Sequence, residues 1–162
     1  MKSKHTIILT VRNAVGVLTR VTGLLAQRGY NIESTIAAPT ENPDIFKIIL
    51  VVEGSEQNIE QVTKQLNKLI DTLKVTDISH DNNFIVREYI ILKVKINKKC
   101  RSEVLELLEV FSARPLDVAQ THIIMELSGR AKKIDRLIEL LKPYGINEYV
   151  RSGEFAMTEY DM

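Results

Sequence analysis

The sequence predicts an α+β protein built from two β-α-β-β-α-β units in tandem. Segments of alternating apolar residues enclose segments with helical periodicity, and this order occurs twice. A polar stretch from Ser79 to Asn83 separates the two occurrences. At 162 residues the chain is long enough for two small domains, each with its own apolar core.

The first unit contains six predicted elements. In chain order they are His5 to Val11, Val17 to Arg28, Asn31 to Ala38, Ile45 to Val52, Glu56 to Ile70 and Leu73 to Ser79. The second and fifth are helices and the others are strands. The helix from Glu56 follows Ser55, which is placed to cap it, and its apolar residues recur every three or four positions.

The third strand indicates how the first sheet is arranged. Residues Ile45 to Val52 are apolar on both faces, so we expect this strand in the middle of a sheet covered on both sides. The β-α-β-β-α-β order of the ferredoxin-like fold places both helices on one face. Because a large exposed apolar face usually marks an interface, we expect a dimer or a docked second domain on the other.

The second unit repeats the order after the polar stretch. Its elements are predicted at Ile85 to Ile96, Ser102 to Phe111, Leu116 to Ala119, His122 to Leu127, Ala131 to Leu141 and Ile146 to Arg151. The chain is therefore predicted to be two ferredoxin-like βαββαβ domains in tandem. We expect a first domain over residues 1–79, a linker over 80–84 and a second domain over 85–162.

Charge and hydropathy exclude several classes of protein. The formal net charge is +1, with nine basic and eight acidic residues up to His80 and thirteen of each afterwards, so neither half carries a nucleic-acid footprint. The longest apolar runs are far shorter than the ~20 residues of a membrane span. No signal peptide is recognisable at the N-terminus, and the single cysteine, Cys100, cannot form an internal disulfide. We expect a soluble, cytoplasmic protein.

The turn from Asn13 to Gly16 is the candidate ligand site. It precedes a helix, whose unpaired N–H groups and dipole favour a carboxylate or phosphate, and glycine permits close approach to the backbone. The corresponding turn of the second half, Asn97 to Cys100, has no glycine, which assigns the site to the first half. On local sequence alone, Asn13 reads as a turn initiator and Asn31 as a residue that tolerates a left-handed conformation.

Catalytic chemistry has little support in the sequence. His5, His80 and His122 lie on different predicted elements without ligand spacing, so we expect surface or strand-edge positions for them. Cys100 lacks a catalytic signature and is interpreted as a partly buried thiol at a helix start. The glutamates at 103, 106 and 109 follow helical spacing and are interpreted as a solvated face.

Several motifs resemble one known family. The segment from Asn13 to Ser34 with its QRGYNIES motif, the APTENPD segment from Ala38 to Asp44, and the Arg151-Ser152-Gly153 sequence are similar to the regulatory (small) subunit of acetolactate synthase, also called acetohydroxyacid synthase. The first domain of that family is an ACT domain, a small-molecule regulatory module. The resemblance covers nearly the whole chain.

The resemblance implies a non-catalytic subunit in branched-chain amino acid biosynthesis. Such a subunit activates the catalytic (large) subunit and confers feedback inhibition by a branched-chain amino acid, typically valine, with leucine and isoleucine as further ligands. Thiamine diphosphate, Mg²⁺ and FAD are expected in the catalytic partner, and no cofactor in this chain.

The resemblance also implies where the effector binds. It places the effector between two first domains of a homodimer, with the carboxylate on the backbone N–H groups from Gly16 to Leu18 and Asn13 on the polar groups. Asn31 would reach the effector from the same or the neighbouring subunit. Val17, Leu18 and Ile32 would lie near its side chain.

Two other functions are compatible with this element order. One is an amino-acid-binding ACT protein that serves a different enzyme, for which the first half would suffice. The other is an RNA-binding module, which requires stacking aromatic residues on its central strands and a basic surface. Phe46 is the only aromatic residue in the strand from Ile45 to Val52, which argues against the second.

Overall fold

The computed structural model describes residues 3–81 and 83–159, and the chain divides into two compact units. Unit 1 combines residues 1–86 with 153–162, and unit 2 contains residues 87–152. The described elements are β1 (Ser3–Arg12), α1 (Val17–Gln27), β2 (Ile32–Pro39), β3 (Ile45–Gly54), α2 (Glu56–Leu66), β4 (Thr72–Asp77), β5 (Phe84–Lys95), α3 (Arg101–Phe111), β6 (Arg114–Val118), β7 (His122–Gly129), α4 (Ala131–Leu141), the 3₁₀ turn η1 (Lys142–Tyr144) and β8 (Ile146–Thr158). The predicted order of elements and the tandem ferredoxin-like fold are confirmed.

The domain boundaries of 1–79, 80–84 and 85–162 stay a prediction. Part of the expected linker, residue 82, lies outside the described residues, as do residues 1–2 and 160–162 at the ends of the expected domains. The division by contacts places both the start of β5 and the end of β8 in unit 1.

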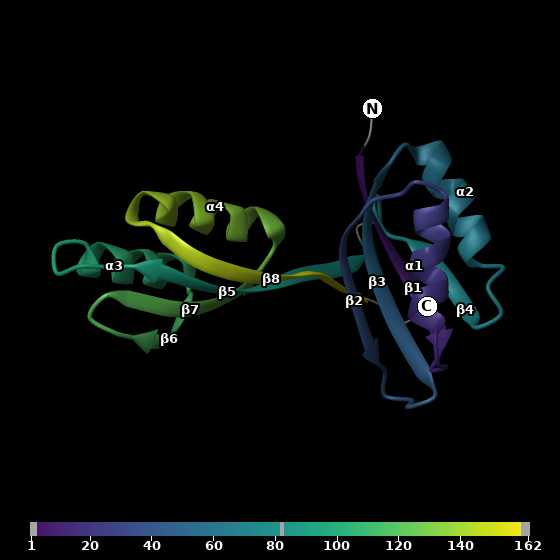
Figure 1. Cartoon of the computed structure of the whole chain (residues 1–162), viewed down its shortest axis with the longest axis horizontal. Helices are drawn as coiled ribbons and strands as arrows, with labels where there is room; N and C mark the ends of the chain where they lie inside the picture. Colours follow the sequence, from purple (N-terminus) through teal and green to yellow (C-terminus); the bar gives the residue numbers. More distant parts are fainter. Residues whose placement is uncertain (1–2, 82, 160–162) are drawn as a thin grey trace. The chain divides into compact units, whose positions relative to one another are not determined.

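Unit 1 is an antiparallel sheet with α1 and α2 on one face (Figure 1). The strand order is β2-β3-β1-β4, so the doubly apolar β3 lies inside the sheet, as predicted. The core between sheet and helices consists of Ile7, Leu9, Val11, Val17, Val21, Leu25, Ile48, Leu50, Val52, Ile59, Val62 and Leu66. Alternate residues of β1 and β3 enter it, as the two-residue period of a strand requires.

The second helix ends earlier than its sequence pattern predicts. It stops at Leu66, and turn hydrogen bonds follow from the N–H of Lys68 to the carbonyl of Gln65 and from Leu69 to Leu66. Leu69 still packs against the core, whereas Ile70 is 85% exposed. The apolar periodicity therefore continues past the last α-helical turn, which is why the sequence overstates its length.

Segments from the far end of the chain cover part of the other face of this sheet. Ile8 and Ile49 of the sheet form a small buried cluster with Ile78 and with Ala156 of β8. Phe84 from the start of β5 packs against the same cluster. The last strand, expected to end near Arg151, continues to Thr158, and its final residues are part of unit 1.

Unit 2 repeats the architecture with strand order β6-β7-β5-β8. Its two α-helices are α3 and α4 (Figure 1). They contribute Val104, Leu108, Ile134, Leu137, Ile138 and Leu141 to the core. At its edge, Arg151 of β8 pairs with Glu88, whose side chain is 8% exposed, and with Asp135 of α4 at 2.7 Å. Burial alone would lower the pKa of Arg151, but hydrogen bonds to these two carboxylates outweigh it and raise the pKa. Within the described residues, none of the helices is long and apolar enough to cross a membrane.

Candidate functional site

The turn between β1 and α1 is held by backbone hydrogen bonds from two neighbouring loops. The N–H of Asn13 donates to the carbonyl of Asp44 at 2.8 Å, and the N–H of Arg12 donates to the carbonyl of Asp71 at 2.8 Å. The Asn13 side chain adds a third link, because its Nδ2 donates to the carbonyl of Pro43 at 2.9 Å. Asn13 therefore uses one N–H of its side-chain amide on the neighbouring loop, and its Oδ1, the acceptor atom, is available to a ligand.

Gly16 ends this turn and begins the helix. Its φ of 79° and ψ of 3° are left-handed, a conformation that glycine adopts without a side-chain penalty. Glycine cannot cap the helix with a side chain, and the first turn of α1 contains no acidic residue. The N–H of Val17 donates to the carbonyl of Ala14 at 3.2 Å, but the N–H groups of Leu18 and Thr19 donate to no described residue. Two backbone donors thus point out of the helix end.

The other helix of unit 1, α2, is capped at its N-terminus by its own side chains. The Oγ of Ser55 accepts a hydrogen bond from the N–H of Asn58, and Glu56 supplies a negative charge in the first turn. Both features satisfy the helix end internally. The start of α1 lacks both of them, which leaves it suited to an external anion.

Arg20 adds a positive charge to this turn, and the sequence analysis did not identify it. Its Nη1 donates to the carbonyl of Val15 at 3.3 Å, and its Nη2 pairs with Asp71. A Cβ on Gly16 would lie 3.2 Å from Nη1, so the guanidinium lies directly beside the glycine. A cation one turn into a helix opposes the helix dipole, and this mismatch is the signal that could have identified Arg20.

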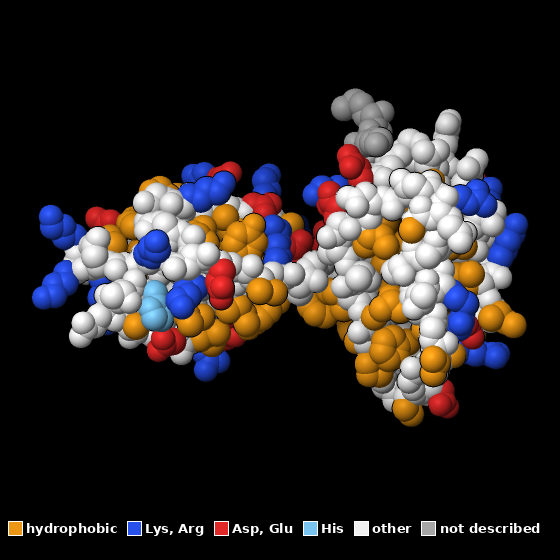
Figure 2. Space-filling view, in the orientation of Figure 1, with side chains coloured by type: hydrophobic (Ala, Val, Ile, Leu, Met, Phe, Trp, Pro, Cys, Tyr) orange, Lys and Arg blue, Asp and Glu red, His pale blue; other side chains and the backbone are white. Residues whose placement is uncertain are grey.

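Exposed apolar side chains surround the turn. Val15 is fully exposed, Leu18 is 38% exposed, and Ile70 and Leu73 near Asp71 are 85% and 50% exposed. Figure 2 shows that hydrophobic side chains are exposed on the face of unit 1 that it draws. By contrast, the side chain of Val17 is buried in the core, so of its groups only the backbone remains at the site.

Asn31 and Ile32 lie at the opposite end of the sheet. Ile32 pairs with Val52, whereas Asn13 bonds to Asp44 at the start of the same strand. Eight residues of β3 separate these levels, which corresponds to roughly 25 Å at about 3.3 Å per residue. The structure therefore brings Asn13, Gly16, Val17 and Leu18 together but separates Asn31 and Ile32 from them within one copy. Asn31 is exposed, and Ile32 packs partly against the core.

The turn that occupies the same position in unit 2 is filled by its own side chain. The Oδ1 of Asn97 accepts hydrogen bonds from the N–H groups of Lys99 at 2.8 Å and Cys100 at 3.1 Å. The Cys100 Sγ accepts from the N–H of Asn97 at 3.3 Å. This self-capped turn supports the expectation that the ligand site belongs to the first half.

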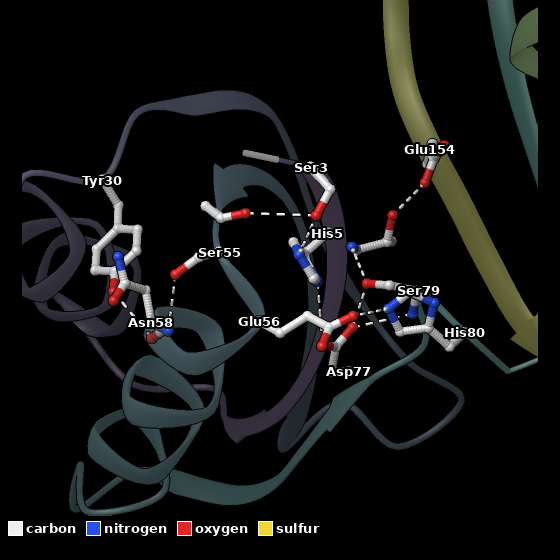
Figure 3. A network of polar contacts seen from close by, with 12 residues as sticks. Ser3, His5, Tyr30, Ser55, Glu56, Asn58, Asp77, Ser79, His80 and Glu154 are labelled. Atoms are coloured by element: carbon white, nitrogen blue, oxygen red, sulfur yellow. Dashed lines mark hydrogen bonds and ion pairs between the residues drawn. The ribbon is translucent and has the colours of Figure 1, made fainter. Parts of the chain in front are cut away.

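A histidine cluster in unit 1 corrects one expectation (Figure 3). His5 was expected at the surface or a strand edge, but it is 1% exposed on an inner strand. It alternates with Ile7, Leu9 and Val11, a pattern that places it on the buried face. Its Nδ1 lies 3.5 Å from Asp77, and its ring meets that of His80 edge-on at 6.0 Å. Across residues 3–81 and 83–159, no group of three or more His, Cys, Asp or Glu side chains is arranged to hold a metal ion.

Comparisons with known proteins agree along the whole chain. Residues 7–74 match the family described as AHAS small subunit-like ACT domain, and residues 87–160 match the small subunit of acetolactate synthase. The acetolactate synthase small subunit of Bacillus subtilis is 46% identical over 94% of this chain and 89% of its own length. A probable acetolactate synthase small subunit of Archaeoglobus fulgidus is 43% identical over 95% of this chain and 96% of its own.

A solved structure extends the likeness to three dimensions. The acetolactate synthase small subunit of Thermotoga maritima superposes with a TM-score of 0.88 at 31% sequence identity. The superposition covers 99% of both chains. Both tandem units of this chain therefore have a counterpart in that protein.

Proposed function

The chain belongs to the family of acetolactate synthase small subunits, and we propose that it binds valine between two copies of unit 1 and thereby inhibits the catalytic subunit. Family membership makes it a regulatory subunit in branched-chain amino acid biosynthesis, paired with the catalytic large subunit. In the proposal, thiamine diphosphate, Mg²⁺ and FAD belong to that partner. The proposal further concerns how the effector binds and how two copies of the chain form a homodimer.

The open start of α1 is the observation that carries the proposal. The N–H groups of Leu18 and Thr19 find no partner among the described residues, and the Arg20 guanidinium lies beside Gly16. Backbone donors, the helix dipole and a cation together favour a carboxylate. The Oδ1 of Asn13 can then accept a hydrogen bond from the ammonium group of an amino acid.

The separation of Asn31 from Asn13 supports a site made by two copies. β2 is an edge strand of the described sheet, and it runs in the same direction as β1 because both are antiparallel to β3. An edge strand offers its free backbone groups to another strand. A second copy related by a two-fold axis would run its β2 in the opposite direction.

Such pairing brings the required groups to one end of the sheet. With the axis beside the centre of β2, Ile32 of the second copy comes level with Pro39, which pairs with Phe46. That level is two residues from Asp44, to which the Asn13 backbone bonds. Asn31 and Ile32 of one copy thus approach the Asn13 turn of the other. The fully exposed Val15 of the turn offers additional apolar area for this contact, whereas Ile70 and Leu73 lie on the β4 side of the sheet, away from β2.

The ligand's side chain would meet Leu18 of one copy and Ile32 of the other. An apolar pocket discriminates one methylene by about 1–3 kcal/mol, so leucine and isoleucine also bind, with lower or similar affinity. Valine regulates because it binds only the paired arrangement and shifts the population toward it. A coupling of about 1–3 kcal/mol would shift the equilibrium between the two arrangements about 5- to 150-fold.

Calorimetry and a reconstituted activity assay test this function. We expect valine to bind the isolated chain and to inhibit the catalytic subunit only when this chain is present. Asn13→Ala should abolish the heat of binding while the circular dichroism spectrum stays unchanged. Binding without any stimulation of an acetolactate synthase catalytic subunit would instead indicate an ACT protein that serves a different enzyme. Absence of binding by valine, leucine and isoleucine would contradict the proposal.

A further inference from the structure

We propose that residues 153–158 of β8, here named the C-terminal strap, hold the start of β2 in the conformation that receives the effector. This inference rests on the proposed function, because it concerns how Asn31 and Ile32 are presented. It assigns positioning roles to Thr6, Gly153 and Glu154, which contact no part of the proposed effector.

The strap crosses one row of residues on the helix-free face of the first sheet. Thr6 and Ser34 both pair with Val51, so the three lie side by side across β1, β3 and β2. The Oγ1 of Thr6 donates to Oε2 of Glu154 at 2.5 Å. A Cβ on Gly153 would lie 2.5 Å from both Cβ and Oγ of Ser34. Val51, between these contacts, is only 6% exposed.

An apolar contact fixes the strap two residues further along. Ala156 is 6% exposed and packs with Ile8, Ile49 and Ile78. Phe155 and Met157, which alternate with it, are 46% and 66% exposed. The strap therefore has a buried inner side with one polar and one apolar anchor, and its outer side faces away from the sheet.

The strand below the strap is irregular at the effector end. Its register with β3 shifts between Ile32 and Ser34, which indicates a bulge at Glu33. A bulge interrupts the ladder of hydrogen bonds, so the residues before it depend on other contacts for their position. Ser34 is the first residue after the shift, and it is the residue that Gly153 touches. Glu33 has a further contact, an ion pair with Lys4 at 2.7 Å.

Gly153 is suited to this contact by its lack of a side chain. Its φ of 82° is left-handed, and any Cβ would overlap Ser34. Because the Gly153 backbone packs directly on Ser34, Ser34 cannot shift toward the strap unless the strap moves as well. The docked strap and the effector-binding position of Asn31 are therefore linked, and by reciprocity each stabilises the other by the same factor.

Three variants alter the polar anchor with little change of shape: Thr6→Val removes the hydrogen-bond donor, Glu154→Gln replaces the charged acceptor with a weaker, neutral carboxamide oxygen, and the double variant combines them. Glu148→Gln, an exposed glutamate on the same strand, is the matched control. Gly153→Ala is the stronger disruption, but it also strains the backbone. Each is tested with the full chain, the catalytic subunit and valine, by reconstituted activity, calorimetry and hydrogen exchange.

We expect each single variant to raise the valine concentration for half-maximal inhibition by about fivefold or more. The double variant should be no worse than Thr6→Val alone, because both substitutions act on the same interaction. Stimulation of the catalytic subunit without valine should stay at the wild-type level, a result that a general loss of structure would not give. Values within about twofold of wild type in both single variants would overturn the inference.

Hydrogen exchange separates this inference from the proposed function. Without any effector, amides of residues 32–34 should exchange faster in Thr6→Val, which lacks the hydrogen-bond donor, than in the wild-type chain and in Glu148→Gln. Equal rates overturn the inference whether or not an effector binds. If the wild-type chain binds none of valine, leucine and isoleucine, the proposed function fails, and the effector role of the strap fails with it. Normal valine binding and inhibition in the variants would overturn only the inference about the strap and leave the proposed function intact.

Discussion

Gly16 combines two requirements at one residue. Its left-handed backbone lets the chain turn from β1 into α1, and its missing side chain leaves room beside the Arg20 guanidinium. A side chain here would occupy the position proposed for the carboxylate of the effector. The sequence identified the glycine turn, but the role of Arg20 depends on its contacts with Val15 and Asp71, which the local pattern does not reveal.

Gly16→Asp should make the complex insensitive to valine without unfolding it. The new carboxylate lies beside Arg20 and competes with the effector carboxylate, while the left-handed backbone costs about 1–2 kcal/mol for a non-glycine residue. The valine concentration that gives half-maximal inhibition in the reconstituted assay measures the competition with the effector. The free energy of unfolding in urea measures the backbone cost. Gly16→Ala is the control for the backbone cost and the added Cβ without the new charge. A folded Gly16→Asp chain with full valine sensitivity would place the carboxylate elsewhere.

Arg151 is expected to stabilise unit 2 by neutralising a buried carboxylate. Removing it in Arg151→Ala leaves Glu88 buried without its partner, which costs about 3–5 kcal/mol in comparable cases. The free energy of unfolding in urea checks this value. Adding Glu88→Gln in the same chain should recover part of the loss because the orphaned charge is gone. If Arg151→Ala costs under about 1 kcal/mol, the pair has only the value of a surface ion pair.

At the scale of elements, the two helices of unit 1 differ in how their N-termini are satisfied. The N-terminus of α2 is capped by Ser55 and has Glu56 in its first turn. By contrast, α1 follows a glycine that provides no side-chain cap, so backbone N–H groups of its first turn remain available to a ligand. The contrast between a self-sufficient helix end and an open one is the physical basis for placing a ligand at α1. The sequence carried this contrast, because Ser55 and Gly16 are both visible in it.

Ser55→Ala should destabilise unit 1 without affecting effector binding. Loss of the Oγ that accepts from the N–H of Asn58 costs about 1 kcal/mol at an N-cap. Thermal and urea unfolding report the change, and valine titration reports binding. Ser102→Ala, in the first turn of α3 and exposed, is the control and should change stability little. A Ser55→Ala chain that is as stable as wild type would show that this cap contributes nothing measurable.

Periodicity predicted every helix and strand, but several boundaries depend on contacts that lie far apart in sequence. The end of β8 is the largest difference. Gly153 interrupts its apolar pattern, and only Ala156 of the following residues is deeply buried against Ile8, Ile49 and Ile78. The sequence pattern after Gly153 is too weak to predict a strand, because the packing that holds these residues involves parts of the chain far away in sequence. His5 shows the converse, because its alternation with Ile7 and Leu9 was a usable signal.

At the scale of the whole molecule, the first sheet has a face that this chain covers and an open edge that we propose a second copy covers. The chain itself supplies the cover over Ile8 and Ile49, through the start of β5 and the end of β8. The open edge of β2 and the exposed Val15 of the Asn13 turn are the surfaces proposed to meet a second copy. The candidate residues were predicted by resemblance, but the distance of roughly 25 Å between their two groups emerged only from the strand register.

Mixing two inactive variants tests the central claim most directly. Asn13→Ala and Asn31→Ala chains should each bind no valine in calorimetry, since each damages both sites of its own dimer. After the two are unfolded and refolded together, half of the dimers pair one chain of each kind, and each of these has one intact site. We predict recovery of about a quarter of the wild-type number of sites, at wild-type affinity. No recovery from dimers shown to be mixed would contradict a site shared between two copies.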